Sequence, residues 1–233
     1  MEIEILYEDP HLIVCVKPPK VPSQGDPTGD ADMLTLLKEH LKKEYPKVKN
    51  PYLGLVHRLD RPVGGVMVFA KTKEANGFLS KQMQDKSFQK KYLVVACGKP
   101  EQTQGELKDF LLKLSSVNMS KVVETGTKNS KEAILEYEVL KTIKDEQYGQ
   151  LSLMKINLKT GRHHQIRVQL AYSGLGIWGD NKYNKAFVKN KEWTQIALWS
   201  TELSFIHPKT KKRLVYTSIP EEVLPFSLFT NIL

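Results

Sequence analysis

The sequence predicts an α+β domain that is rich in sheet. Short apolar or alternating runs indicate strands, and apolar residues at helical spacing indicate helices between some of them. No internal repeat or low-complexity linker divides the 233 residues. With 40% hydrophobic and 26% charged residues, the composition is that of an ordinary globular protein. We therefore expect a single domain over residues 1–233.

The N-terminal part predicts a strand, a loop and a helix. The apolar run Leu12–Val16 indicates a buried strand, which Pro18 ends. Residues 21–32 are rich in Pro, Gly and Asp, as is typical of a loop. Asp32 is expected to cap a helix that runs to about Tyr45 and carries its leucines on one face.

The next segment predicts a connection between extended segments, followed by a helix and a strand. Asp60 lies between the extended segment Leu53–Leu59 and the alternating strand Val66–Lys71. Thr72 is expected to cap a helix with an apolar stripe, and Lys90–Gly98 follows as a strand.

The C-terminal half predicts more strands than helices. Leu135–Val139 alternates, and Leu151–Leu158 is a further strand. A short helix is expected over His163–Tyr172, ended by the Gly that follows. Ala197–Ile206 and Leu214–Ile219 are expected to pair around a turn.

The charge balance points to a polyanionic partner. The chain has 35 Lys and Arg against 26 Asp and Glu, a formal net charge of +9 and a pI near 9.3. Nucleic acid is the leading partner class for such a chain. A basic protein without such a partner stays open on charge alone, because net charge reports on association and not on fold.

The cysteines and the length of the apolar runs indicate the cellular compartment of the protein. Cys15 and Cys97 each lie in an apolar run without a CxxC or His-spaced partner, so we expect buried thiols rather than a disulfide or zinc site. No run of about 18 apolar residues occurs, and the acidic start lacks the pattern of a signal peptide. We expect a cytoplasmic protein with no membrane partner.

The first candidate site is the segment His57–Gly65. It places Asp60 between Arg58 and Arg61, on a loop that Pro62 and two glycines make tight. A lone Asp in a turn is usually structural, but here the two guanidinium groups are expected to keep the carboxylate ionised. The segment differs from a kinase catalytic loop and lacks that loop's metal-binding Asn. Phosphoryl transfer is therefore not indicated.

The second candidate site is the segment Thr160–Val168. Arg162, His163, His164 and Arg167 gather near the start of the expected helix, where backbone amides favour an anion. The adjacent His pair points in different directions on a helix and has no acidic residue or Cys at i+3 or i+4. We expect no metal site.

The third motif, Gly174–Gly179, has the form GxGxxG but does not follow a strand or open a helix. A Gly-rich turn that positions Asp180 and Tyr183 explains it better than a dinucleotide site.

Five blocks in one order carry a family resemblance. They are Val16–Pro19, His57–Asp60 with Gly65–Thr72, Lys91–Gly98, Thr160–Arg167, and Gly179-Asp180 with Tyr183. With these blocks the chain resembles the RluA family of RNA pseudouridine synthases. The resemblance implies the pseudouridine synthase fold, with a mixed, mainly antiparallel sheet, flanking helices and a central active-site cleft.

The resemblance also implies the reaction and its partners. Such enzymes isomerise uridine to pseudouridine in structured RNA, with neither metal nor organic cofactor. We expect ribosomal or transfer RNA as substrate, no DNA and a monomer. The chain resembles a short form without an S4-type RNA-binding domain, because the block near Leu12 already belongs to the catalytic domain.

The resemblance implies roles for individual residues. Asp60 corresponds to the catalytic aspartate, Tyr92 to the tyrosine that packs on the target base, and Arg167 to the arginine that pairs with the aspartate. Arg58 corresponds to the residue that fills the stack after the uridine flips out. Further substrate contacts are expected from His57, Arg162 and His164.

One departure from the family pattern lies beside the aspartate. Relatives commonly carry Asp-Thr/Ser-Ser-Gly where this chain has Pro62-Val63-Gly64-Gly65, which puts hydroxyl contacts there in doubt. Two other classes stay open: a non-catalytic RNA-binding module on the same fold, and an unrelated basic nucleotide hydrolase. The first is expected to lose one of the three catalytic residues, and the second to need a metal-binding cluster.

Overall fold

The computed structural model describes residues 2–189 and 193–232 and confirms the α+β class. The chain divides into two compact units. The first consists of Met1–Lys90 with Ser200–Ile219, and the second of Lys91–Trp199 with Pro220–Leu233. The single domain expected over residues 1–233 stays a prediction.

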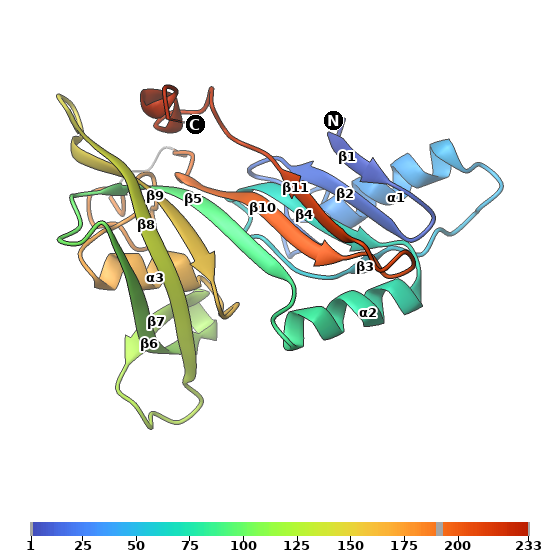
Figure 1. The fold of residues 1–233 in the computed structure, drawn as a ribbon, viewed down its shortest axis with the longest axis horizontal. Coiled ribbons are helices and arrows are strands. Elements are labelled where there is room, and N and C mark those ends of the chain that lie inside the picture. The colour runs from blue at the N-terminus through green and yellow to red at the C-terminus, as the bar shows by residue number, and fades with distance from the viewer. Residues whose placement is uncertain (1, 190–192, 233) are drawn as a thin grey trace. The chain divides into compact units, whose positions relative to one another are not determined.

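The first unit is built on a sheet (Figure 1). Its strands, in spatial order, are β1 (Ile5–Glu8), β2 (Leu12–Lys17), β4 (Gly64–Ala70) and β10 (Leu198–Ile206), the last counted from Ser200. The short strand β3 (Gly54–Leu55) pairs with β4, and β11 (Arg213–Thr217) pairs with β10. The pairings of β1 with β2, β2 with β4, β3 with β4 and β10 with β11 are antiparallel.

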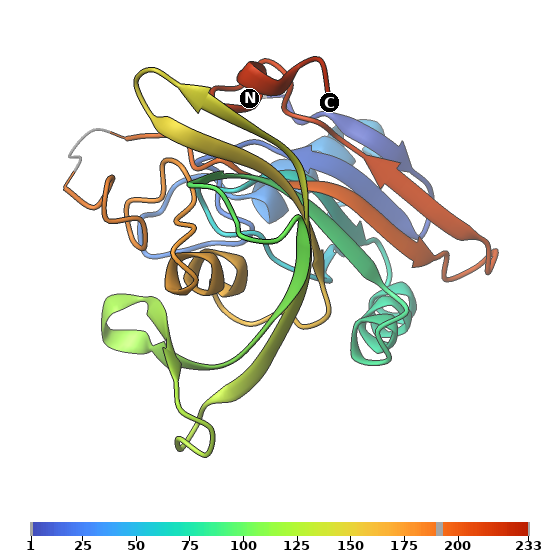
Figure 2. The same ribbon diagram turned by 60° about the vertical axis from the view of Figure 1, so that its left-hand side comes forward.

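Two helices accompany this sheet, α1 (Met33–Glu44) and α2 (Lys73–Gln84). Every residue of β2 and β4 is buried, so both faces of these strands are covered. Leu79 of α2 packs into the core with Val66 and Val68 of β4. Figures 1 and 2 place α1 and α2 on different sides of the strands.

The predicted starts of both helices are confirmed. The Asp32 side chain accepts hydrogen bonds from the amides of Leu34 and Thr35, and Thr72 Oγ1 accepts one from Ala75 N. These contacts satisfy amides that the first helical turn leaves without partners.

The second unit holds an antiparallel sheet (Figure 2). The spatial order of its strands is β5 (Gln89–Cys97, counted from Lys91), β9 (Gly149–Leu158), β8 (Lys131–Asp145), β6 (Gln104–Leu114) and β7 (Met119–Val123). Two short 3-10 turns, η1 (Ser115–Val117) and η2 (Phe226–Phe229), complete it. Three strands, β1, β6 and β7, were not predicted, and β8 is longer than the predicted Leu135–Val139.

Helix α3 (Gln165–Tyr172) starts two residues later than the expected His163. His164 adopts a left-handed conformation with φ 54°, which a right-handed helix does not accommodate, so the helix begins after it. Val168 packs against Leu111 and Ala133 of the sheet. The helix is buried through Leu170, including its polar residues.

The two cysteines are unpaired. Cys15 is buried as predicted, but Cys97 is only half-buried, and its sulfur accepts a hydrogen bond from Asn184 at 3.4 Å. No helix in residues 2–189 or 193–232 is long and apolar enough to cross a membrane.

Gly65, the second residue of β4, permits a close approach between strands. It has φ +116°, and a Cβ there would lie 2.6 Å from the backbone nitrogen of Ser200. Gly65 therefore has a backbone reason in this chain, independent of the family pattern.

We predict that Gly65→Ala lowers the free energy of unfolding by more than about 2 kcal/mol, because both the conformation and the space exclude a methyl group. Gly77→Ala is the matched control. Gly77 lies inside α2 with nothing within 4 Å of its Cβ position, so alanine there should be neutral or stabilise by up to about 1 kcal/mol. Urea denaturation measures both, and an unchanged midpoint for Gly65→Ala would contradict the account.

Candidate active site

The predicted site residues fall into two groups, one in each unit. His57, Arg58 and Asp60 belong to the first unit, and Tyr92, Arg162, His164 and Arg167 to the second. Each group is built by local contacts of its own unit.

Asp60 opens a tight turn between β3 and β4. The amide of Val63 donates to the carbonyl of Asp60 at 2.9 Å, which closes the turn across Arg61 and Pro62. The Asp60 side chain is half-buried. A loop on a rigid sheet is a common place for an active carboxylate.

Ser23 holds the residue before Asp60. Its hydroxyl donates to the carbonyl of Leu59 at 2.8 Å and accepts from the amide of Leu59 at 3.1 Å. Both Ser23 and Leu59 are buried. One side chain thus satisfies both backbone groups of Leu59, as a neighbouring strand would do.

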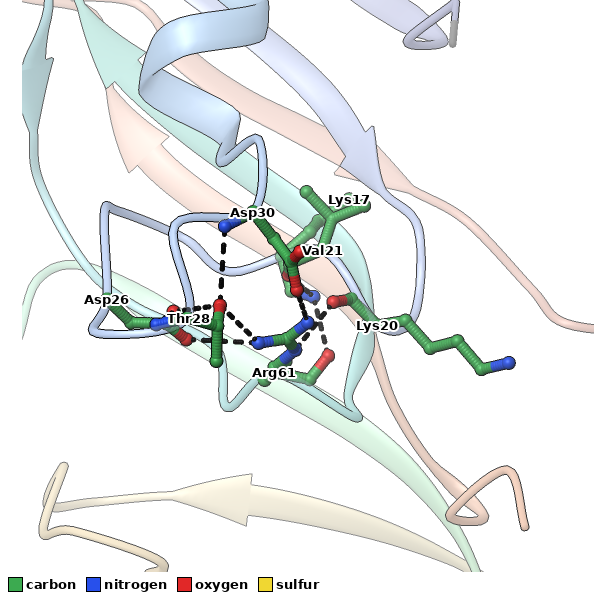
Figure 3. Close-up of polar contacts among 7 residues, drawn as sticks. All are labelled: Lys17, Lys20, Val21, Asp26, Thr28, Asp30 and Arg61. Carbon is green, nitrogen blue, oxygen red and sulfur yellow. Dashed lines mark hydrogen bonds and ion pairs between the residues drawn. The ribbon is translucent and has the colours of Figure 1, made fainter. Parts of the chain in front are cut away.

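Arg61, the residue after Asp60, is held in place by hydrogen bonds to its backbone carbonyl (Figure 3). Arg61 O accepts from the amide of Lys20 at 3.0 Å and from Nζ of Lys17 at 3.1 Å. Nζ of Lys17 also donates to the carbonyls of Pro18 at 3.0 Å and Val21 at 2.6 Å. Asp60 therefore lies between two residues that are each bound to the segment after β2.

The Lys17 ammonium is fully buried at the end of β2. Burial lowers the pKa of Lys17 to about 7, the negative charge of Asp60 opposes this, and the positive charge of Arg61 adds to it. Lys17 thus belongs to the electrostatic environment of the candidate carboxylate.

The two arginines beside Asp60 behave differently from each other. Arg58 is exposed, as its predicted role requires. The guanidinium of Arg61 donates to Asp26, Thr28, Asp30 and the carbonyl of Lys20 (Figure 3). The Arg61 guanidinium therefore donates to acceptors in the loop after β2, and the sequence did not indicate these contacts.

His57 is buried and is held by the sheet. Its Nε2 accepts from the amide of Val68 at 3.2 Å, and its ring lies 5.7 Å from that of Phe88. Burial lowers the pKa of His57 to about 3, and the charge of Lys90 acts in the same direction. This geometry gives a neutral His57 a structural role in the sheet, and its predicted substrate contact stays a prediction.

In the second unit, Arg167 forms a buried ion pair with Asp180. Arg167 donates from Nε at 2.8 Å and from Nη2 at 2.7 Å to the two oxygens of that carboxylate. Asp180 Oδ1 also accepts from the amide of Lys182 at 2.9 Å. The predicted pairing of Arg167 with Asp60 stays a prediction.

Tyr183 joins His164 to this pair. Its hydroxyl accepts from the amide of Ser120 at 2.7 Å and lies 2.8 Å from Nδ1 of His164. The Arg167 guanidinium lies over the Tyr183 ring at 5.3 Å. Within the Gly-rich turn, the carbonyl of Ile177 accepts from the amide of Asp180 at 3.2 Å, and the positioning of Tyr183 by this turn stays a prediction.

The remaining predicted residues lie on the sheet and its connection. Tyr92 faces Ile156 across β5 and β9 and is 5% exposed. Arg162 is exposed, and its Nε donates to the carbonyl of Glu132 at 2.8 Å. His164 is buried.

The described residues include no group of three or more His, Cys, Asp or Glu side chains placed to hold a metal ion.

Sequence reasoning missed three contributors: Ser23, Lys17 as a buried charge, and Asp180 as the partner of Arg167. A Lys at the end of an apolar strand, directly before Pro-Pro, is the one local signal that could have pointed to Lys17.

Comparisons with known proteins bear on this site. A family model described as RNA pseudouridylate synthase matches residues 11–172. The chain is 34% identical over 215 residues to the ribosomal large subunit pseudouridine synthase C of Buchnera aphidicola subsp. Schizaphis graminum, which covers 90% of this chain. This chain spans 65% of that relative, slightly less than two thirds.

A second relative has nearly the same length. The chain is 31% identical over 231 residues to the tRNA pseudouridine synthase C of Haemophilus influenzae, covering 93% of this chain and 92% of that protein.

Two solved structures share the fold. Human RNA pseudouridylate synthase domain containing 4 is 21% identical, with a TM-score of 0.77, and covers 97% of this chain and 91% of its own. Human RNA pseudouridylate synthase domain containing 1 is 17% identical, with a TM-score of 0.75, and covers 97% and 86%.

The buried Lys17 predicts a pH-dependent stability. Its pKa in the folded protein is below its value in the unfolded chain, so the unfolded chain binds more protons between about pH 7 and pH 10. Relative to Lys17→Met, the wild type should therefore gain stability as pH rises through this range, by up to about 1.4 kcal/mol per pH unit. Below about pH 6 the difference should be constant.

Urea denaturation of both proteins from pH 5 to pH 9 measures this difference. Groups common to the two proteins cancel, so a difference that stays flat above pH 7 would show that the Lys17 ammonium is not destabilised by burial.

Proposed function

The chain belongs to the RNA pseudouridylate synthase family, and on that premise we propose that it isomerises specific uridines to pseudouridine in structured ribosomal or transfer RNA. The observation that carries the proposal is that the family match over residues 11–172 includes Asp60, Tyr92 and Arg167. The basic net charge of +9 fits an RNA substrate.

We assign the central step to the Asp60 carboxylate. The bond between N1 of uracil and C1′ of ribose breaks, the base turns, and a bond forms between C5 and C1′. Asp60 acts at C1′, by attack on that carbon or by starting an elimination. The proton that leaves C5 balances the one that N1 gains, so the net change is an isomerisation.

The geometry around Asp60 suits this role. A reacting group gains most when the protein holds it in place before the substrate arrives. Ser23 holds Leu59, and Lys17 and Lys20 hold Arg61, so the turn that carries Asp60 has little freedom.

Arg167 and Tyr92 complete the proposed machinery. Arg167 is held in place by two hydrogen bonds to Asp180, and the action of Arg167 with Asp60 is a part of the proposal that rests on the family resemblance. Tyr92 supplies a flat ring for the target base and a hydroxyl that can accept the C5 proton. Its low exposure means that the base has to enter the protein to reach it.

Access to the buried atoms of uridine requires base flipping. Arg58 is exposed and lies two residues before Asp60, and we propose that it enters the stack that the uridine leaves. Phosphate contacts from the Lys and Arg surface would supply most of the affinity.

Base-resolved pseudouridine mapping tests the function. Ribosomal and transfer RNA from cells with and without the gene are compared, and the gene is returned as wild type or as Asp60→Asn. The proposal expects discrete uridines that lose pseudouridine and regain it only with the wild type. Identical maps in all strains, with RNA binding retained, would favour the non-catalytic RNA-binding module.

We predict that Asp60→Asn reduces turnover by more than tenfold and leaves RNA affinity nearly unchanged, because the carboxylate acts in the chemistry while phosphate contacts dominate binding. Asp85→Asn, at the exposed C-terminal end of α2, makes the same charge change outside the Asp60 turn. Single-turnover kinetics and filter binding measure both variants. Turnover above about a tenth of wild type in Asp60→Asn would remove the assigned role.

For Tyr92→Phe we predict that RNA binding persists while pseudouridine formation stalls after the glycosidic bond breaks. The phenyl ring keeps the stacking surface but has no hydroxyl to take the C5 proton. The readout is the nucleoside product, separated by chromatography after single turnover. Near-normal pseudouridine formation would leave stacking as the only role of Tyr92.

A further inference from the structure

We propose that Arg61 is a positioning residue for Asp60, which it holds in place through the loop of residues 20–30. The inference rests on the proposed function, because its main readout is turnover. It adds a residue that lies next to the carboxylate in sequence but directs its side chain to another part of the unit.

The guanidinium of Arg61 uses all three of its nitrogens on the 20–30 loop (Figure 3). Nε donates to the carbonyl of Lys20 at 2.9 Å. Nη1 donates to Thr28 Oγ1 at 2.9 Å and to Asp26 Oδ2 at 3.3 Å, and Nη2 donates to Asp30 Oδ2. The planar fork of arginine matches this set of acceptors, which a lysine could satisfy only in part.

Contacts within the loop also hold the acceptors of Arg61 in place. Asp26 Oδ1 accepts from the amide of Thr28 at 3.0 Å, and the amide of Asp30 donates to Thr28 Oγ1 at 3.3 Å. Gly29, with φ +74°, lets the chain turn between them. The loop thus presents an ordered set of hydrogen-bond acceptors to the guanidinium.

Both ends of the loop are anchored in the first unit. At one end the amide of Lys20 donates to Arg61 O, and at the other Asp32 caps α1. The amide of Met33 donates to the carbonyl of Pro22 at 2.9 Å, which ties the end of the loop to its beginning.

The effect reaches Asp60 through the backbone. The 20–30 loop grips Arg61 by its guanidinium and, through Lys20, by its carbonyl. These contacts fix the position of the Arg61 backbone nitrogen, and the hydrogen bond from Val63 N to Asp60 O then orients the planar peptide between Asp60 and Arg61. A displacement of about 1 Å in a reacting group can cost about 100-fold in rate.

The same contacts argue against Arg61 as a phosphate-binding residue. Arg61 with Asp26 and Asp30 carries a formal charge of −1, and hydrogen bonding to Asp30 with the charges of both carboxylates raises the pKa of Arg61. A phosphate would have to displace two carboxylates from a guanidinium whose nitrogens all have acceptors.

The contacts are too exposed to matter much for stability. The side chains of Arg61, Asp26 and Asp30 are 37%, 30% and 56% exposed, and such ion pairs contribute about 0–1 kcal/mol each. Positioning therefore predicts a loss of turnover without a comparable loss of folding.

The experiment compares variants that break the same contact but change the net charge in opposite directions. Arg61→Gln removes a positive charge, whereas the double variant Asp26→Asn with Asp30→Asn removes two negative charges from the same cluster. Arg61→Lys is the conservative variant, and Lys38→Gln, on the exposed side of α1, is the control for losing one positive charge. kcat and KM are measured on an RNA that carries a mapped uridine.

Positioning predicts that Arg61→Gln and the Asp26/Asp30 double variant both lower kcat by about tenfold or more, with Arg61→Lys intermediate. Adding Arg61→Gln to the double variant should cause no further loss, because both changes break the same contact. Lys38→Gln should keep the wild-type kcat, and thermal unfolding should differ little among the variants.

Two kinetic results would overturn the proposal. One is a kcat within about twofold of wild type in both Arg61→Gln and the double variant. The other is an unchanged kcat with a KM that rises in Arg61→Gln and falls in the double variant, as expected of a phosphate contact.

Amide hydrogen exchange at Val63, which donates to Asp60 O, tests the positioning without any turnover. It should accelerate in Arg61→Gln and in the double variant, and unchanged exchange would also overturn the proposal. A wild type that makes no pseudouridine while the variants show faster exchange would refute the proposed function and retain the positioning.

Discussion

The hydrogen bonds between the Asp60 turn and the segment after β2 are the constraint on which the site depends. Ser23 satisfies both backbone groups of Leu59, and Lys17 places a buried ammonium on the carbonyl of Arg61. A buried charge is expensive unless it is hydrogen-bonded, and here the three carbonyls that receive it include the one directly after Asp60. The cost of burying Lys17 is thus offset by contacts that order the loop.

The sequence predicted the helices that bury one face and the strands that are buried on both faces. β2, β4, α1 and α2 carry apolar patterns that match their faces, and the caps at Asp32 and Thr72 are local signals. The strands β1 and β7 were missed because they are only four and five residues long, and β6 because charged side chains interrupt its apolar pattern. The start of α3 was placed too early because a left-handed His164 leaves no mark in an apolar pattern.

The candidate site residues were predictable where they lie within one short segment of the sequence. Asp60 stands out between two arginines, and Arg167 lies within a block of basic and polar residues. Ser23 is 36 residues from Leu59, and Lys17 is 44 residues from Arg61, so their contacts exist only once the sheet has formed. The direction of the Arg61 side chain, and the choice of Asp180 as a partner of Arg167, likewise depend on tertiary structure.

The family resemblance inferred from five sequence blocks is confirmed by the match to the family model, and the fold by the two human structures. The most direct measurement of the central claim incubates the purified chain with RNA from cells that lack it. No metal or cofactor is added, and pseudouridine is quantified at single-base resolution. The account predicts conversion at the same uridines that lose pseudouridine in those cells, and none with Asp60→Asn. RNA that is bound by the folded chain but stays unconverted would contradict it.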